Sequence, residues 1–332
     1  MIVKKRIQQR ITTGKFVLPV VMLLSIAIWA GVYSLKPTIV FSKSSSLVWQ
    51  LLEPFLIEKP VSLIINYLLY AVIGYLLIVL NNTFAIIRLR ASIQTSLYFI
   101  IIAACPELYP LQIGSVTTLF MVGSIYFLFQ SYQQTKSSGS IFYSWMFLGF
   151  ASLLLPQLLF LTPLYLVGAY NFQSLNPKSF FAGLIGVMVP YWFLLGYAFS
   201  LNQFEVLYHP LEELCTFTPI DFLAFKIWQI AIIIYLALIF FVAITNSLIN
   251  GWQDKIRTRS YINFFSIMGV CLLALVILQQ QHFSTMFPLL LICFSFLAGH
   301  FFALTHSRGS NIFFIISLIG LLVLLSFNMW ML

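Results

Sequence analysis

The stretch WMFLGFASLLLPQLLFLTPLYLVGAY, residues 145–170, carries no charged side chain and is interrupted by Pro156 and Pro163. With the four residues before it, this stretch is long for one helix of the ~20 residues that cross a bilayer and short for two. A proline removes a backbone donor and bends or ends a helix, so the pattern alone leaves one pass or two open. The number of passes here fixes the side on which every later segment lies.

The composition places the chain in a membrane. Hydrophobic residues make up 61% of the 332 residues, charged residues only 8%, and the mean hydropathy is +1.00. A soluble domain of this length could not solvate such a surface. We therefore expect an all-α, polytopic transmembrane bundle of about 11 spans. The expected spans are 16–35, 61–80, 91–105, 111–131, 141–155, 157–170, 180–200, 224–248, 261–279, 286–304 and 311–331.

The charges favour two passes in the opening stretch. With two passes and a cytoplasmic N-terminus, the basic residues divide 13 to 4 between the inner and outer sides, whereas one pass gives 9 to 8. Basic residues favour the cytoplasmic side of membrane proteins, so we predict a cytoplasmic N-terminus and an external C-terminus. The inner bases are Lys4, Lys5, Arg6, Arg10, Lys15, Arg88, Arg90, Lys136, Lys178, Lys255, Arg257, Arg259 and Arg308.

We expect three parts: a basic cytoplasmic N-terminus (1–15), a membrane module (16–200), and an outer loop with a four-helix C-terminal membrane part (201–332). The apolar run after residue 15 is too long for a cleaved signal peptide and is predicted to stay as the first span. The net charge of +9 then reflects insertion and attraction to anionic lipid headgroups at the cytoplasmic face, and we expect no binding of nucleic acid.

The first outer loop is predicted to carry an interfacial helix over residues 46–58. Its apolar residues recur every four positions, and Gln50 and Glu53 fall off that stripe. The segment also carries Glu58. The two glutamates are either the solvated edge of this helix, candidate catalytic carboxylates, or contacts for a partner protein.

The second outer loop, residues 202–221, holds Glu205 and His209. A carboxylate beside an imidazole can bind a ligand or transfer protons, but the same spacing suits a solvated loop with a short interfacial helix. We retain both residues as candidate ligand-binding groups.

Arg88 and Arg90 lie at the inner end of the third span, where arginines anchor helices to phosphate headgroups and also form specific lipid-phosphate sites. We keep both as candidate ligand-binding residues, and residues 250–260 have the same two interpretations. His300 is the ionisable group well inside a predicted span, and it is either hydrogen-bonded between helices or part of a proton relay.

Motifs for nucleotide, zinc-protease and serine-hydrolase chemistry are absent from the sequence, so we expect no cofactor and no metal. The four cysteines show no CxxC spacing. Cys105 and Cys215, both on the predicted outer side, would pair only in an oxidising compartment.

Residues 85–200 carry a family resemblance. The run AIIRLRASIQTSLYFIIIAACPELYPL (85–111) begins with basic residues and ends with a proline at the outer face, and FAGLIGVMVPYWFLL (181–195) follows later. This order resembles the middle of the GT-C superfold of glycosyltransferases, and the pattern also resembles an uncharacterised polytopic inner-membrane family of Bacteroidota. The resemblance implies a GT-C-like bundle in the first seven spans and a polyprenyl-phosphate-linked sugar donor at the outer leaflet. It also implies a catalytic carboxylate in the first outer loop, but residues 36–60 contain no Asp.

Three functions stay open for a protein of the bacterial inner membrane. The first is a non-catalytic scaffold or subunit of a cell-envelope assembly system, with other envelope proteins as partners. The second is a glycosyltransferase that uses Glu53 or Glu58 on a polyprenyl-phosphate lipid. The third is a lipid or small-solute transporter or flippase.

Overall fold

The computed structural model describes residues 7–35, 49, 59–88, 92–202, 204–205, 208, 212, 214, 225–305 and 307–331. In these ranges every regular element is a helix. Eight of the helices are long and apolar enough to cross a membrane. The protein is therefore a multi-pass membrane protein; the count of 11 spans and their orientation stay predictions.

Each predicted span that the structure describes coincides with a helix or helix pair. The α-helices are α1 (Ile7–Thr12), α2 (Val17–Leu35), α4 (Lys59–Phe84), α5 (Ile93–Ala103), α6 (Ile113–Gln130), α7 (Ser138–Leu154), α8 (Thr162–Asn171), α9 (Pro177–Leu201), α11 (Ile227–Asn250), α12 (Ile256–Leu278), α13 (Phe283–Leu304) and α14 (Arg308–Met331). Short 3-10 helices are η2 (Pro106–Leu108), η3 (Pro156–Leu161), η5 (Gly251–Gln253) and η6 (Gln280–His282).

The stretch 145–170 folds as two antiparallel pieces. Pro156 opens η3 and Pro163 lies in the first turn of α8, so the two prolines mark the reversal between α7 and α8. The far ends of α6 and α8 are joined where the backbone N–H of Gln133 donates to the carbonyl of Phe172 at 2.9 Å. The reversal is the arrangement that the charge distribution favours.

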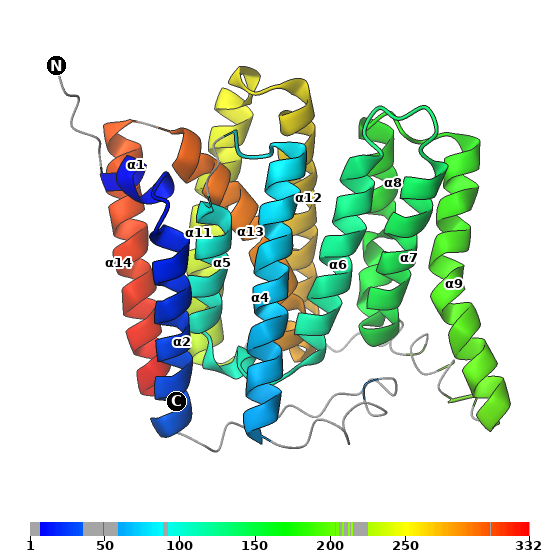
Figure 1. The fold of residues 1–332 in the computed structure, drawn as a ribbon, viewed down its shortest axis with the longest axis horizontal. Helices are drawn as coiled ribbons and strands as arrows, with labels where there is room; N and C mark the ends of the chain where they lie inside the picture. The colour runs from blue at the N-terminus through cyan, green and yellow to red at the C-terminus, as the bar shows by residue number, and fades with distance from the viewer. Residues whose placement is uncertain are drawn as a thin grey trace.

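The core is built around α13. This helix contacts α5, α6, α11 and α12, and every residue from Met286 to Ala303 is buried. Helices α6 to α9 form one side of the bundle, and α1, α2 and α14 form the other (Figure 1). The outward faces of α2, α9 and α14 expose many large apolar side chains, as expected for surfaces covered by lipid.

Close backbone contact joins α7 to α9. A Cβ atom added to Gly186 would lie 2.5 Å from the carbonyl oxygen of Phe142, and one added to Gly183 would lie 2.9 Å from the Trp145 ring. Helices in lipid gain little from burying apolar area against each other, so small residues that allow close approach are the typical contact.

Contacts between connections define one end of the bundle, which we call the basic end. The side-chain amide of Gln8 donates to the carbonyls of Phe302 and Thr305, and Arg88 donates to the carbonyl of Gln253. The bases described there are Arg10, Lys15, Arg88, Lys136, Lys178, Lys255, Arg257, Arg259 and Arg308. The described bases that the sequence assigned to one side therefore lie at one end of the bundle. Helix α1 lies at this basic end, and α14 runs from it to the opposite end (Figure 1).

Polar side chains inside the bundle mostly satisfy nearby backbone. The amide nitrogen of Asn66 on α4 contacts the carbonyls of Leu108, Tyr109 and Pro110 at 2.8–3.0 Å, which fixes the turn between α5 and α6. The side chain of Gln229 accepts from the backbone N–H of Lys226 at the start of its own helix.

The predicted interfacial helix 46–58 lies outside the described residues except for Trp49. Trp49 is buried against Leu111, Ile113 and Leu154. This indole therefore packs on the ends of α6 and α7 instead of standing free at the bundle surface.

Candidate functional site

An arginine, an aspartate and a histidine from three separate segments meet at the basic end. Nη2 of Arg88 lies 3.1 Å from Oδ1 of Asp254, and Nε2 of His300 lies 3.2 Å from Oδ2. Only 9% of the Asp254 side chain and 6% of the His300 side chain are exposed, whereas Arg88 is 39% exposed. We call these three residues the Arg–Asp–His cluster.

The turn after α4 positions Arg88. Ala85 adopts a left-handed conformation with φ of 50°, which reverses the chain directly after the helix. The side-chain oxygen of Asn81 then accepts the backbone N–H of Ile87 at 2.8 Å. These local contacts hold Arg88 against Asp254 and the carbonyl of Gln253.

Asp254 lies in the short connection between α11 and α12. Its backbone N–H donates to the carbonyl of Gly251 at 3.0 Å, which closes the turn of η5 and directs the residue toward α13. Burial by itself raises the pKa of Asp254, but the contact with His300 and the positive charges of His300 and Arg88 outweigh burial. The net effect is a pKa below the ordinary value of this carboxyl group.

His300 brings the central helix into the cluster. Its neighbour Gly299 lies against α5, because a Cβ atom added there would meet Cβ of Gln94 at 3.2 Å. Gln94 is fully buried, and neither polar atom of its amide has a hydrogen-bond partner among the described residues. Burying an amide without a hydrogen-bond partner costs about 1–3 kcal/mol of folding free energy. The contact between α5 and α13 therefore contains a polar group that the described residues leave unsatisfied.

A second arginine stands beside the cluster in an aromatic box. The Arg257 guanidinium lies 5.5–5.7 Å from the ring centroids of Phe84, Tyr132 and Tyr261. Its Nε also donates to the hydroxyl of Tyr261 at 2.7 Å. Cation–π contacts and this bond hold Arg257 as part of the structure that joins α4, α6 and α12.

The opposite end has a different ion pair. Lys226, at the start of α11, contacts Glu107 in η2, with side chains 64% and 28% exposed. The amide of Gln112 donates to the backbone carbonyl of Glu107. This pair ties the α5–α6 turn to α11 at the surface of the bundle.

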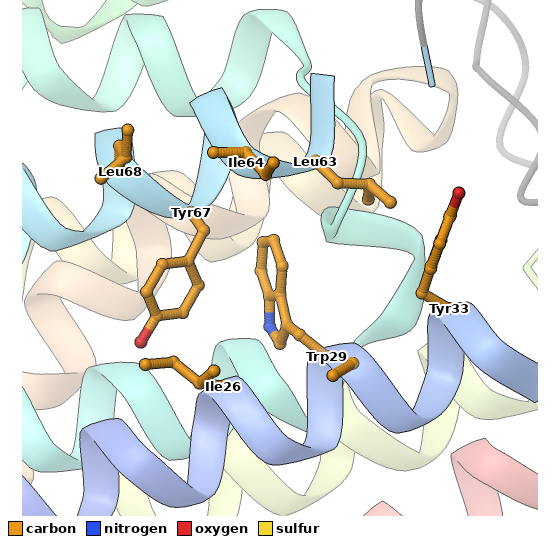
Figure 2. A pocket seen from close by; sticks show the side chains of 8 residues that line it. Ile26, Trp29, Tyr33, Leu63, Ile64, Tyr67 and Leu68 are labelled. Carbon is orange, nitrogen blue, oxygen red and sulfur yellow. The ribbon is translucent and has the colours of Figure 1, made fainter. Parts of the chain in front are cut away.

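An apolar groove runs between α2 and α4 in the half of the bundle away from the basic end (Figure 2). Its volume is about 310 Å³, and Trp29 and Tyr67 line it together with aliphatic side chains of both helices. Trp29 is held by stacking on Tyr109 at 4.2 Å, and Tyr67 by a contact with Ser25 at 3.0 Å. Tyr33, near the end of α2, and Leu63, near the start of α4, lie at one end of the groove.

The predicted site residues separate in space. Arg88 belongs to the cluster at the basic end, whereas Glu205 is exposed just beyond the far end of α9. Glu53, Glu58, Arg90 and His209 lie outside the described residues. The proposed roles of these residues stay predictions. Cys105 is a buried free thiol, and Cys215 is likewise not described.

Sequence reasoning missed Asp254 as the partner of His300 and Arg88. Two features of the sequence could have indicated this contact. Asp254 is the single acid in the predicted inner segments, and His300 lies one or two turns from the inner end of its predicted span. Because 46 residues separate the two in sequence, their contact depends on how α12 and α13 pair.

The geometry of the Arg–Asp–His cluster favours a structural role, the joining of helices, over a catalytic one. Each oxygen of Asp254 lies within 3.2 Å of a nitrogen of Arg88 or His300, and Arg257 is held by aromatic rings. Within the described ranges, no three His, Cys, Asp or Glu side chains are placed to hold a metal ion. Comparison with protein-family models, curated proteins and solved structures finds no match for this chain.

Proposed function

We propose that this protein is a non-catalytic integral membrane scaffold, or subunit, of a bacterial cell-envelope assembly system. The observation that supports this proposal is internal pairing: the described ionic groups nearest the core are used to tie helices together. The Arg–Asp–His cluster joins the α4 turn, the α11–α12 connection and α13, and Glu107 with Lys226 joins η2 to α11. A bundle packed around a central helix that is buried from Met286 to Ala303 suits a protein that holds others in place.

The proposed setting is the inner membrane, with 11 spans, the basic end in the cytoplasm and the C-terminus outside. The clustering of basic residues at one end supports this orientation, because such residues resist transfer across the membrane during insertion. The segments that join the helices at the other end would then face the envelope, where partner proteins are met.

Complementation of a deletion strain tests the scaffold. A protein with Glu53→Gln and Glu58→Gln together should restore envelope integrity, measured as resistance to detergent, at wild-type protein levels. A Leu51→Lys, Leu52→Lys protein should fail, because it places charge on the apolar stripe of the predicted outer helix. Loss of complementation in the double Gln protein, with normal accumulation, would favour catalysis and contradict the scaffold.

The groove between α2 and α4 favours a second candidate, an enzyme that acts on a polyprenyl-phosphate-linked sugar. The groove is apolar, opens sideways from a membrane-embedded helix pair, and has at one end Tyr33 and Leu63, which come before and after residues 36–58 in sequence. A bilayer-exposed groove with these walls fits an isoprenoid chain, and Glu53 and Glu58 would be the candidate catalytic groups for the attached sugar. The GT-C-like order of helices agrees with this candidate and is itself part of the proposal.

Mass spectrometry of co-purifying lipids distinguishes the two candidates. Under the enzyme proposal, the wild-type protein is enriched in polyprenyl phosphate, and Ile64→Trp, which fills the groove, removes that enrichment. Ile185→Trp is the matched control, because Ile64 and Ile185 are similarly exposed (61% and 57%) and Ile185 lies on α9, away from the groove. Bulk phospholipid alone in all three samples would contradict the enzyme and leave the scaffold.

A further inference from the structure

A polar pocket of about 310 Å³ lies at the basic end, between the last turn of α11 and the first two turns of α12. It differs from the α2–α4 groove because much of its wall is polar. Its polar lining side chains are Ser247, Arg259, Ser260 and Asn263, and Leu248, Gly251 and Trp252 complete the lining.

The pocket has a positive charge that the described residues do not neutralise. Arg259 has no ion pair among them, and Lys255 and Arg257 are on the same short segment. The nearest acid in sequence, Asp254, is already occupied by Arg88 and His300.

Apolar side chains surround the polar wall. Leu248, Ile249, Trp252 and Ile256 are each at least 68% exposed, and all four lie within two turns of Arg259 or the hairpin connection. Exposed aliphatic residues beside a tryptophan and several bases are typical of the boundary between hydrocarbon and headgroups. The pocket therefore opens at the level where lipid phosphates lie.

We propose that this pocket binds the phosphate of an anionic lipid headgroup. The Arg259 guanidinium offers a planar set of donors that matches phosphate oxygens, and the hydroxyl of Ser247 and the amide of Asn263 offer neutral donors on the two sides. The acyl chains would lie along Leu248 and Ile249. The site is independent of the proposed scaffold function, since any membrane protein with this hairpin would have it.

Native mass spectrometry of the full chain in detergent provides the test. The probes are dioctanoyl phosphatidic acid, dioctanoyl phosphatidylcholine and inorganic phosphate. We expect one phosphatidic acid molecule to be retained by the wild-type protein. Arg259→Gln should weaken its retention about tenfold, the size expected for loss of a charge-assisted hydrogen bond, and Arg259→Lys should weaken it less.

Arg308→Gln is the matched control, because Arg308 is an exposed base at the same end but outside the pocket. Equal loss in Arg259→Gln and Arg308→Gln would show attraction by overall charge and overturn the proposal. Retention of inorganic phosphate in competition with the lipid would also overturn it, by identifying a soluble ligand. Unchanged melting temperatures of the variants exclude misfolding as the cause of lost binding.

Discussion

The two ends of the bundle each carry an ion pair, and the two pairs differ in burial. At the basic end, the side chain of Asp254 is almost fully enclosed and contacts the side chains of Arg88 and His300. At the opposite end, Lys226 reaches Glu107 across the surface and is 64% exposed. Water and salt weaken the exposed pair, whereas removing one member of the buried cluster leaves a charge without a partner.

The difference shows where this fold is sensitive to a single polar residue. The buried cluster holds a loop, a helix hairpin and the central helix together, so its contribution depends on all three members. The exposed pair joins α11 to the turn at Glu107, and Asn66 and Gln112 also hold that turn through contacts with its backbone carbonyls. We therefore expect substitutions in the buried cluster at the basic end to destabilise the fold much more than substitutions in the exposed pair at the opposite end.

The largest effect is expected for Asp254→Ala. This change leaves Arg88 and His300 without the carboxylate. Breaking a fully buried pair costs about 3–5 kcal/mol, and because Arg88 is 39% exposed to solvent we expect about 2–3 kcal/mol here. The measurement is the thermal unfolding midpoint of the detergent-solubilised protein. Glu205→Ala serves as the control, since Glu205 is an exposed acid and its removal should leave the midpoint nearly unchanged. A similar midpoint for both variants would mean that the cluster does not hold the helices together.

His300→Gln should have a smaller effect than Asp254→Ala, about 1–2 kcal/mol. Glutamine can still donate to Asp254, and Arg88 continues to neutralise the carboxylate. A double-mutant cycle with Asp254→Asn measures the coupling between the two residues. Additive losses would show that the 3.2 Å approach of His300 to Asp254 contributes nothing to stability.

Acid should weaken the buried cluster by a smaller amount. The pKa of Asp254 is lowered in the folded protein, so its stabilisation is fully present above the unfolded value near 3.8 and is lost as pH falls through the lower folded value. The loss is smaller than in Asp254→Ala because a protonated carboxyl keeps its volume and can still form a hydrogen bond. Unfolding midpoints between pH 6 and pH 3 should fall more for the wild-type protein than for Asp254→Asn. Parallel curves for the two proteins would contradict the lowered pKa.

The helices themselves followed from the sequence because apolar length and charge are local properties. The charge distribution favoured the reversal that the structure places at Pro156 and Pro163, between α7 and α8. The described bases that the sequence assigned to one side also lie at one end of the bundle. The eight long apolar helices confirm a multi-pass membrane protein, while its orientation stays a prediction.

The contacts between helices did not follow from the sequence. His300 was read as a single polar residue inside a span, because nothing local indicates that α12 places Asp254 against it. The pocket at Arg259 also depends on the short turn at η5, which brings α11 and α12 together at Gly251. The hydropathy of the sequence does not predict the geometry of this turn. The sequence predicted the side of the membrane on which each charged residue lies. It did not predict which charged residues form ion pairs with each other.

The smallest effect is expected at the exposed pair. Lys226→Gln or Glu107→Gln should change the free energy of unfolding by less than about 1 kcal/mol, because solvent screens the pair and Asn66 still holds the adjacent turn. The exchange Glu107→Lys with Lys226→Glu restores the attraction and should recover whatever the single changes lose. Raising the salt concentration should reduce even this small difference, whereas it should affect Asp254→Ala much less. A loss at Lys226 as large as that at Asp254 would mean that the surface pair is protected from water by segments around it, and the contrast between the two ends would no longer hold.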